Sequence, residues 1–93
     1  MFKVNEYFEG RVKSIAFTSE DGPATIGVMA KGEYEFGTST IEHMIVVSGE
    51  LSVRLPNTNG FQSFYTGESF IVDADCKFQV VAVVESSYLC KYM

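Results

Sequence analysis

One carboxylate lies in a segment that is otherwise almost entirely apolar. Glu42 is the second residue of the stretch 41–48, Ile-Glu-His-Met-Ile-Val-Val-Ser. If this stretch is a β-strand, side chains alternate between its two faces, so a Glu42 that points inward takes Met44 and Val46 with it. His43, the only histidine of the chain, then lies on the outer face, which argues against a catalytic role for it.

Charged side chains are seldom buried without a partner, so an inward Glu42 predicts a bound ligand or a neighbouring cation such as Arg54 or Lys13. Arg11 and Lys13 are two residues apart and share one strand face, whereas Ser14 points the other way. For each cation, the alternative is an ordinary solvated surface charge. The cations considered for an anionic ligand are Arg11, Lys13, Arg54 and Lys91.

The elements that must position these residues are strands. Short runs of β-branched and aromatic residues recur between Gly, Pro, Asn and Asp, and no long segment has a helical apolar period. We expect an all-β fold in which a meander of hairpins around Gly49 closes into a barrel without exposed edges. Residues 2–8 are expected to form a short helix or an edge strand. The expected strands are 11–18, 25–30, 33–36, 41–48, 50–55, 61–65, 69–72, 77–83 and 86–92.

Length and charge limit what the protein can be. Its 93 residues allow one core, so residues 1–93 are expected to form a single domain. The formal charge of −5 argues against nucleic acid or an anionic membrane as a partner. No apolar run is long enough for a signal peptide or a membrane span, which predicts a cytoplasmic protein. Cys76 and Cys90 lack CxxC spacing and are expected to be small apolar fillers.

Glu42 and Gly49, with six residues between them, resemble the end of the first sequence motif of the cupins. Gly67 resembles the start of the second motif, although Asp73 stands where that motif has proline. Metal-binding cupins carry three histidines beside these motifs, and without three imidazoles the usual site holds no iron, manganese or zinc. The corresponding positions here are Phe36, Thr38 and Phe78. The resemblance therefore implies a cupin-type, jelly-roll-like barrel without a metal.

Further segments, spread almost from end to end, resemble the bacterial pyrimidine/purine nucleoside phosphorylase family. They are Asn5-Glu6-Tyr7-Phe8, Gly10-Arg11-Val12-Lys13-Ser14-Ile15, Gly27-Val28-Met29, Gly32-Glu33-Tyr34, Ser48-Gly49 and Ser86-Ser87-Tyr88-Leu89-Cys90-Lys91-Tyr92. This resemblance implies a small cupin that converts a purine or pyrimidine nucleoside plus inorganic phosphate into free base and α-D-ribose 1-phosphate. It implies no cofactor besides phosphate as co-substrate.

Within that resemblance, the residues take expected roles. Glu42 is expected to bind ribose hydroxyls, the alternative being a structural acceptor for backbone N–H groups. Phe36 and Phe78 are expected to stack on the base, because every base has a π-face, and the alternative is core packing. Catalysis is assigned to Glu42 and Lys13. Substrate binding is assigned to Phe36, Thr38, Met44, Phe78, Tyr88, Arg11 and Arg54, with phosphate at Lys13 or Arg11.

Two further expectations concern assembly and the class of function. Ile45 and Val47 make the outer face of the 41–48 strand apolar, so we expect it to be covered by the N-terminal segment or by a second subunit in a homodimer. The alternative to an enzyme is a non-catalytic cupin that binds a small sugar or nucleoside as a sensor, since the same pocket serves both.

Overall fold

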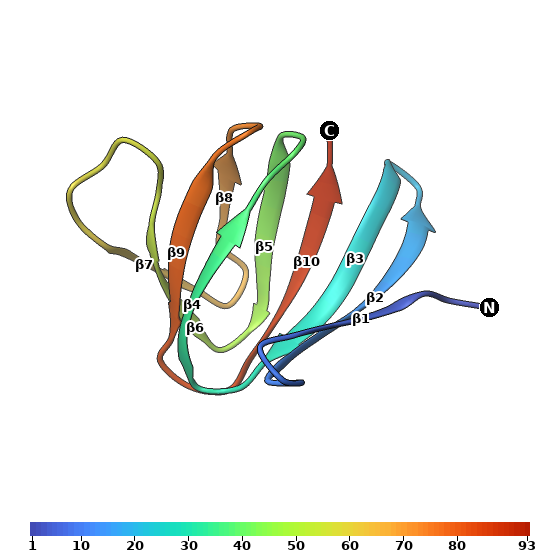
Figure 1. Cartoon of the computed structure of the whole chain (residues 1–93), viewed down its shortest axis with the longest axis horizontal. Helices are drawn as coiled ribbons and strands as arrows, with labels where there is room; N and C mark the ends of the chain where they lie inside the picture. Colours follow the sequence, from blue (N-terminus) through green and yellow to red (C-terminus); the bar gives the residue numbers. More distant parts are fainter.

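The computed structural model describes residues 1–93, which form ten β-strands joined by turns and loops and no helix (Figure 1). The strands are β1 (Val4–Tyr7), β2 (Val12–Ser19), β3 (Gly22–Met29), β4 (Gly32–Gly37), β5 (Glu42–Ser48), β6 (Glu50–Arg54), β7 (Gln62–Tyr65), β8 (Ser69–Val72), β9 (Lys77–Ala82) and β10 (Ser86–Tyr92). The all-β prediction is confirmed. Each expected strand begins and ends within three residues of the corresponding observed strand. Residues 4–7 form the edge strand, not a helix. The chain contains no helix that is long and apolar enough to span a lipid bilayer.

The strands form two antiparallel sheets that pack face to face. One has the order β1-β2-β3-β10-β5-β8 and the other the order β4-β9-β6-β7. The two sheets are not joined into a closed barrel, so that part of the prediction is corrected. From β3 onward most connections cross from one sheet to the other, which leaves each sheet with its own two edges.

Gly49 makes the sharpest of these crossings. It alone separates β5 from β6, and its φ of 109° lies in the left-handed region that favours glycine. A side chain here would collide with Ser86, whose hydroxyl accepts a hydrogen bond from the Glu50 N–H at 3.2 Å. β5 and β6 therefore pair with other strands and not with each other, so the hairpin expected at Gly49 is wrong. The expected hairpin after β6 is confirmed, because β6 pairs with β7.

The core lies between the inner faces of the two sheets. Strand alternation places Met44 and Val46 in it, as predicted, whereas His43 and Ile45 are only partly buried and Val47 is exposed. The buried cluster consists of Val12, Met29, Tyr34, Met44, Val46, Leu51, Val53, Phe64, Phe70, Val72, Phe78, Val80, Ala82, Tyr88 and Cys90.

An apolar row crosses the outer face of the six-stranded sheet. Its members oppose one another in register on five neighbouring strands: Val4, Ile15, Ile26, Leu89 and Ile45. Three of them are exposed, Val4 at 57%, Ile15 at 42% and Ile26 at 45%. The N-terminal strand does not cover the outer face of β5, because β2, β3 and β10 lie between β1 and β5. We call these five residues the outer apolar row.

One end of the sandwich is important for the site. Residues 38–41 connect the end of β4 to the start of β5, so Gly37 and Glu42 lie at the same end of the two sheets. Antiparallel pairing brings the start of β9 and the ends of β6 and β10 there as well. This end, at the top in Figure 1, is called the rim.

Candidate active site

A cavity of about 220 Å³ lies between the two sheets and reaches the rim. Strands of both sheets and the β1–β2 loop form its wall, which is mostly apolar. The lining residues are Tyr7, Phe8, Ser14, Thr25, Met29, Glu35, Phe36, Gly37, Glu42, Met44, Phe78, Tyr88, Cys90 and Tyr92. Five predicted site residues therefore meet in one place: Glu42, Phe36, Met44, Phe78 and Tyr88. We call this space the inter-sheet cavity.

Glu42 is the first residue of β5 and presents its carboxyl group to the cavity. Its Oε1 accepts a hydrogen bond from the Cys90 thiol at a Sγ–O distance of 3.5 Å. Neither ion pair of the structure includes it, so the neighbouring cation expected at Arg54 or Lys13 is absent. Burial raises the pKa of Glu42 above its ordinary value of 4.5. The cavity thus holds an acidic group with no ion-pair partner.

β10 contributes two phenols and a thiol on its inner face. Burial raises the pKa of the Tyr88 phenol to about 12 and raises that of Tyr92 as well. The Tyr92 hydroxyl lies 3.0 Å from the hydroxyl of Thr25, and these two groups share a hydrogen bond. Burial also raises the pKa of the Cys90 thiol to about 12, so this thiol stays protonated and is a poor nucleophile. At neutral pH the phenols are available as hydrogen-bond donors.

Gly27 allows Tyr88 to lie across the cavity. The two residues oppose each other on β3 and β10, and a methyl group at Gly27 would come within 2.5 Å of the Tyr88 ring and hydroxyl. Glycine in the middle of a strand commonly marks such a close approach. The position of Tyr88 therefore depends on a missing side chain on the neighbouring strand.

Three aromatic rings from different elements form the apolar wall. The centroids of Phe36 on β4 and Phe78 on β9 are 5.8 Å apart with an interplanar angle of 34°. Phe8, in the β1–β2 loop, lies 5.6 Å from Phe36 in an edge-on arrangement and 5.0 Å from Tyr34. Phe8 and Glu9 both have positive φ, at 52° and 59°. This loop conformation links an aromatic ring from the edge of one sheet to the rings of the other.

Thr38 was expected beside these rings but does not line the cavity. Its hydroxyl donates to the Asp73 carbonyl at 2.6 Å and accepts from the Cys76 N–H at 3.1 Å. These bonds join the segment after β4 to the turn between β8 and β9. The prediction of Thr38 as a substrate ligand is therefore corrected to a structural role.

The cations expected to hold phosphate do not line the inter-sheet cavity either. Lys13 lies on the outer face, opposite to Ser14, with its Nζ 3.4 Å from the Glu6 carboxylate. The Arg11 guanidinium lies over the Tyr34 ring, 5.3 Å from its centroid. These placements put Lys13 and Arg11, the expected phosphate ligands, outside the lining of the inter-sheet cavity.

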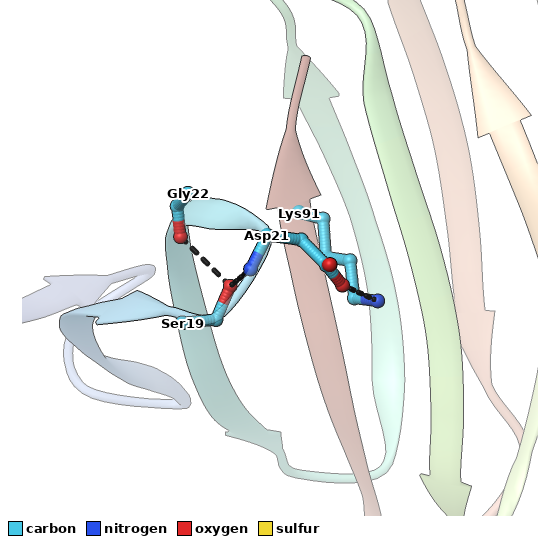
Figure 2. Close-up of polar contacts among 4 residues, drawn as sticks. All are labelled: Ser19, Asp21, Gly22 and Lys91. Carbon is cyan, nitrogen blue, oxygen red and sulfur yellow. Dashed lines mark hydrogen bonds and ion pairs between the residues drawn. The ribbon is translucent and has the colours of Figure 1, made fainter.

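Lys91, the fourth candidate cation, is also engaged on the outer face. Its Nζ lies 2.8 Å from the carboxylate of Asp21, and a dashed line marks this ion pair in Figure 2. Asp21 lies in the turn between β2 and β3. Ser19 stabilises this turn, because its hydroxyl donates a hydrogen bond to the Gly22 carbonyl at 2.7 Å and accepts one from the Asp21 N–H at 3.2 Å. The contact lowers the pKa of Asp21 below its ordinary range. Lys91 thus fastens β10 to the β2–β3 turn.

A second, polar hollow of about 240 Å³ adjoins the rim beside the four-stranded sheet. It contains Arg54, the one predicted cation that faces a cavity. Its walls are Glu35, Arg54, Leu55, Pro56, Asn57, Thr58, Lys77, Phe78 and Gln79. Glu35 and Phe78 line both spaces. We call this second space the rim hollow.

The sequence analysis did not predict several of the lining residues, although strand alternation indicates some of them. Ser14, Thr25 and Met29 lie on the inner faces of β2 and β3, where strict alternation places them. Phe8 carried none, because it is in a loop whose conformation the residue pattern does not specify. Lys77 was overlooked, although it directly precedes Phe78.

Comparison with known proteins gives matches that cover nearly the whole chain. The family model described as pyrimidine/purine nucleoside phosphorylase matches residues 2–92. Proteins named pyrimidine/purine nucleoside phosphorylase from Pseudomonas syringae and Cellvibrio japonicus are 62% and 63% identical over 92 residues, which is 99% of each chain. A crystal structure of a protein of unknown function from Vibrio parahaemolyticus has a TM-score of 0.95 at 38% identity, covering 100% of this chain and 99% of that one. An RmlC-like cupin from Shewanella frigidimarina has a TM-score of 0.77 at 19% identity, covering 98% and 82%, so it shares the fold.

Proposed function

Because this chain belongs to the pyrimidine/purine nucleoside phosphorylase family, we propose that it transfers the ribosyl group of a nucleoside to inorganic phosphate. The products are the free base and α-D-ribose 1-phosphate. The observation that carries the proposal is the end-to-end similarity to proteins of that name. The inter-sheet cavity, which is lined by Glu42 and Glu35 among aromatic rings and phenols, supplies a place for the reaction.

The aromatic wall is proposed to hold the base. Phe36, Phe78 and Phe8 offer π-surfaces to purines and pyrimidines alike, whereas a fixed set of amide groups would select one hydrogen-bonding pattern. The lining contains no Asn or Gln side chain that could impose such a pattern. This composition supports broad base tolerance. Tyr88, whose raised pKa keeps it protonated at neutral pH, is proposed to donate a hydrogen bond to the departing base.

Glu42 is proposed to hold the ribose. A carboxylate accepts hydrogen bonds from ribose hydroxyls, and its charge stabilises the positive charge that develops on the sugar as the glycosidic bond lengthens. Phosphate oxygen then bonds to the anomeric carbon, the electron pair of the broken bond stays on the base nitrogen, and a phosphate proton neutralises that nitrogen. Because Glu42 has no ion-pair partner, its charge is not already compensated by the protein.

We further propose that the reaction uses neither a metal nor an organic cofactor. Two of the three positions that hold histidine in metal-binding cupins carry phenylalanine, and the third, Thr38, bonds to backbone groups. Incubation with EDTA is therefore expected to leave turnover unchanged. Loss of activity on metal removal, with one tightly bound Fe, Mn or Zn per chain in elemental analysis, would contradict this.

The proposed assembly is a homodimer that covers the outer apolar row. The row crosses five strands, and the lysines of this face are already paired with carboxylates, Lys13 with Glu6 and Lys91 with Asp21. Two copies can therefore meet there without bringing unpaired lysines together, although each chain carries a net charge of −5. An apolar face of this kind is typical of a homodimer interface.

The deciding experiment for the function monitors base release from uridine and inosine with and without phosphate. We expect turnover of both nucleosides that depends on phosphate and yields ribose 1-phosphate. Binding of a nucleoside without any turnover would instead identify a sensor. Release of base that is independent of phosphate would identify a hydrolase and would also contradict the proposal.

A further inference from the structure

Phosphate needs cations, and few cations of this chain are free to provide them. Of the seven Lys and Arg residues, Lys13 and Lys91 form ion pairs and Arg11 lies over Tyr34. Lys3 and Lys31 line neither cavity. Arg54 and Lys77 both line the rim hollow, and neither has a carboxylate oxygen within 4 Å. Two cations that form no ion pair thus share one hollow in a chain with a net charge of −5.

The strand register places polar groups around these two cations. Arg54 on β6 opposes Gln79 on β9, and Gln79 in turn opposes Glu35 on β4. Lys77 lies two residues before Gln79 and therefore shares its face of the sheet, which is the outer face, whereas Phe78 between them is buried on the inner face. The hollow thus presents a guanidinium, an ammonium and an amide, all hydrogen-bond donors, on adjacent strands.

The loop after β6 closes one side of the hollow in a fixed conformation. Thr58 donates from its hydroxyl to the Leu55 carbonyl at 2.7 Å, and its backbone N–H donates to the same carbonyl at 3.3 Å. Asn57 has a φ of 63°, in the left-handed region that asparagine tolerates. The loop therefore holds polar side chains opposite the strand cations.

The rim hollow and the inter-sheet cavity share a wall. Glu35 and Phe78 line both, and Lys77 opposes Gly37, which itself lines the inter-sheet cavity. A methyl group at Gly37 would meet only a carbonyl oxygen, at 3.9 Å, so the space around this glycine is open. No side chain at Gly37 stands between the cation and the cavity at this point of the rim.

We propose that the rim hollow is the phosphate subsite, with Arg54 and Lys77 as the anion ligands; this assignment rests on the proposed phosphorylase function. The phosphate oxygens accept hydrogen bonds from both cations, as is usual for guanidinium and ammonium groups. From this position phosphate borders the cavity that holds the ribose. Arg54 thus keeps its predicted role in substrate binding, and Lys77 takes the place expected for Lys13.

Glu35 gives the proposed subsite a means of selecting phosphate. At neutral pH inorganic phosphate still carries at least one proton, which it can donate to a carboxylate. Sulfate has no proton to donate and would be repelled by the same group. We therefore expect phosphate to bind more tightly than sulfate, and the Glu35→Gln variant to reduce that difference.

The test compares Arg54→Gln and Lys77→Met with Lys31→Met, a lysine that lines neither space. Steady-state kinetics should show the KM for phosphate raised about tenfold or more in the first two variants, and the KM for uridine changed much less. The Lys31 variant should match the wild type. Circular dichroism spectra identical to the wild type establish that the variants are folded. An unchanged KM for phosphate in both Arg54→Gln and Lys77→Met overturns the assignment.

A binding measurement separates this inference from the proposed reaction. Titration calorimetry with inorganic phosphate, with and without uridine present, reports the subsite without any turnover. If the wild type binds phosphate and the Arg54 and Lys77 variants do not, the subsite is supported even where phosphorolysis is absent. If the wild type binds no phosphate under either condition, or if all variants bind it equally, the subsite is wrong.

Discussion

Glu42 combines partial burial, a hydrogen bond from a thiol and the lack of an ion-pair partner. Burial favours its neutral form, whereas the proposed role in ribose binding needs the carboxylate. The protein therefore holds this group in a state that costs folding free energy at neutral pH. Such a conflict between stability and the charge needed for activity is common in active sites.

The Glu42→Gln variant tests this conflict through activity. Removing the charge while keeping the size should lower kcat by about 10²-fold or more, with the fold unchanged. The wild-type rate should fall on the acid side with a midpoint above 4.5, because burial raises the pKa of Glu42. Rate measurements across pH should show that acid limb in the wild type and not in the variant. A variant with wild-type kcat would contradict the role.

The same variant should be more stable than the wild type at neutral pH. A carboxyl group whose pKa is raised by folding stabilises the folded state fully only below its unfolded pKa, and that contribution is lost as pH rises through the folded pKa. Melting temperatures should therefore differ most near pH 7 and converge in acid. A Glu42→Gln protein that melts below the wild type at pH 7 would show that the carboxylate is a structural acceptor instead.

Phe36 belongs to the aromatic wall and should act on every base in the same way. Phe36→Ala is expected to raise the KM for purine and pyrimidine nucleosides by similar factors of about tenfold, since stacking contributes about 1–3 kcal/mol per base. The KM for phosphate should change little. Phe61→Ala, at an exposed ring outside the cavity, is the matched control. A raised KM for only purine or only pyrimidine nucleosides would contradict a stacking role.

At the scale of elements, the site depends on how neighbouring strands and loops fit together. Gly27 of β3 has no side chain, and Tyr88 of β10 occupies the space beside it. The β1–β2 loop places Phe8 against the rings of β4, on the other sheet. In both cases the position of an aromatic ring of the site depends on another strand or loop: Tyr88 depends on β3, and Phe8 contacts the rings of β4.

Gly27→Ala should therefore damage the site through Tyr88. The added methyl group has to displace the phenol, with an expected loss of about 1–3 kcal/mol in the free energy of unfolding and a fall in kcat/KM for nucleosides. Gly60→Ala is the control, because a methyl group there meets nothing within 4 Å. Urea denaturation and steady-state kinetics check both effects. If the two variants had the same free energy of unfolding and the same kcat/KM, Gly27 would not position Tyr88.

The sequence predicted where strands lie much better than which strands pair. Alternation and turn residues mark each strand locally, so the inner faces of β5 and β10 and the rings of Phe36 and Phe78 could be foreseen. Pairing depends on crossings between sheets, such as the one at Gly49, that a local pattern does not encode. For the same reason phosphate was expected at Lys13 or Arg11, although Lys13 lies on the outer face of its sheet.

At the scale of the whole molecule, the outer apolar row predicts association. Sedimentation velocity at micromolar concentration should show a dimer for the wild type. Ile26→Lys places a charge in the middle of the row and should shift the protein to monomer, because an unpaired charge in an apolar interface is costly. Ser63→Lys, on the exposed edge strand of the other sheet, adds the same charge as a control. A monomeric wild type, or a dimer in both variants, would contradict this interface.

The position of β10 has a consequence for how the protein is made. β10 is the last strand in the chain, yet it lies in the middle of the six-stranded sheet between β3 and β5. It also carries Tyr88, Cys90 and Tyr92 into the cavity. During synthesis on the ribosome, β3 and β5 emerge before the strand that lies between them, so the six-stranded sheet cannot be completed until β10 has emerged. Completion of this sheet therefore waits for β10, and a nascent chain that stops before β10 lacks both the centre of the six-stranded sheet and the β10 side of the cavity.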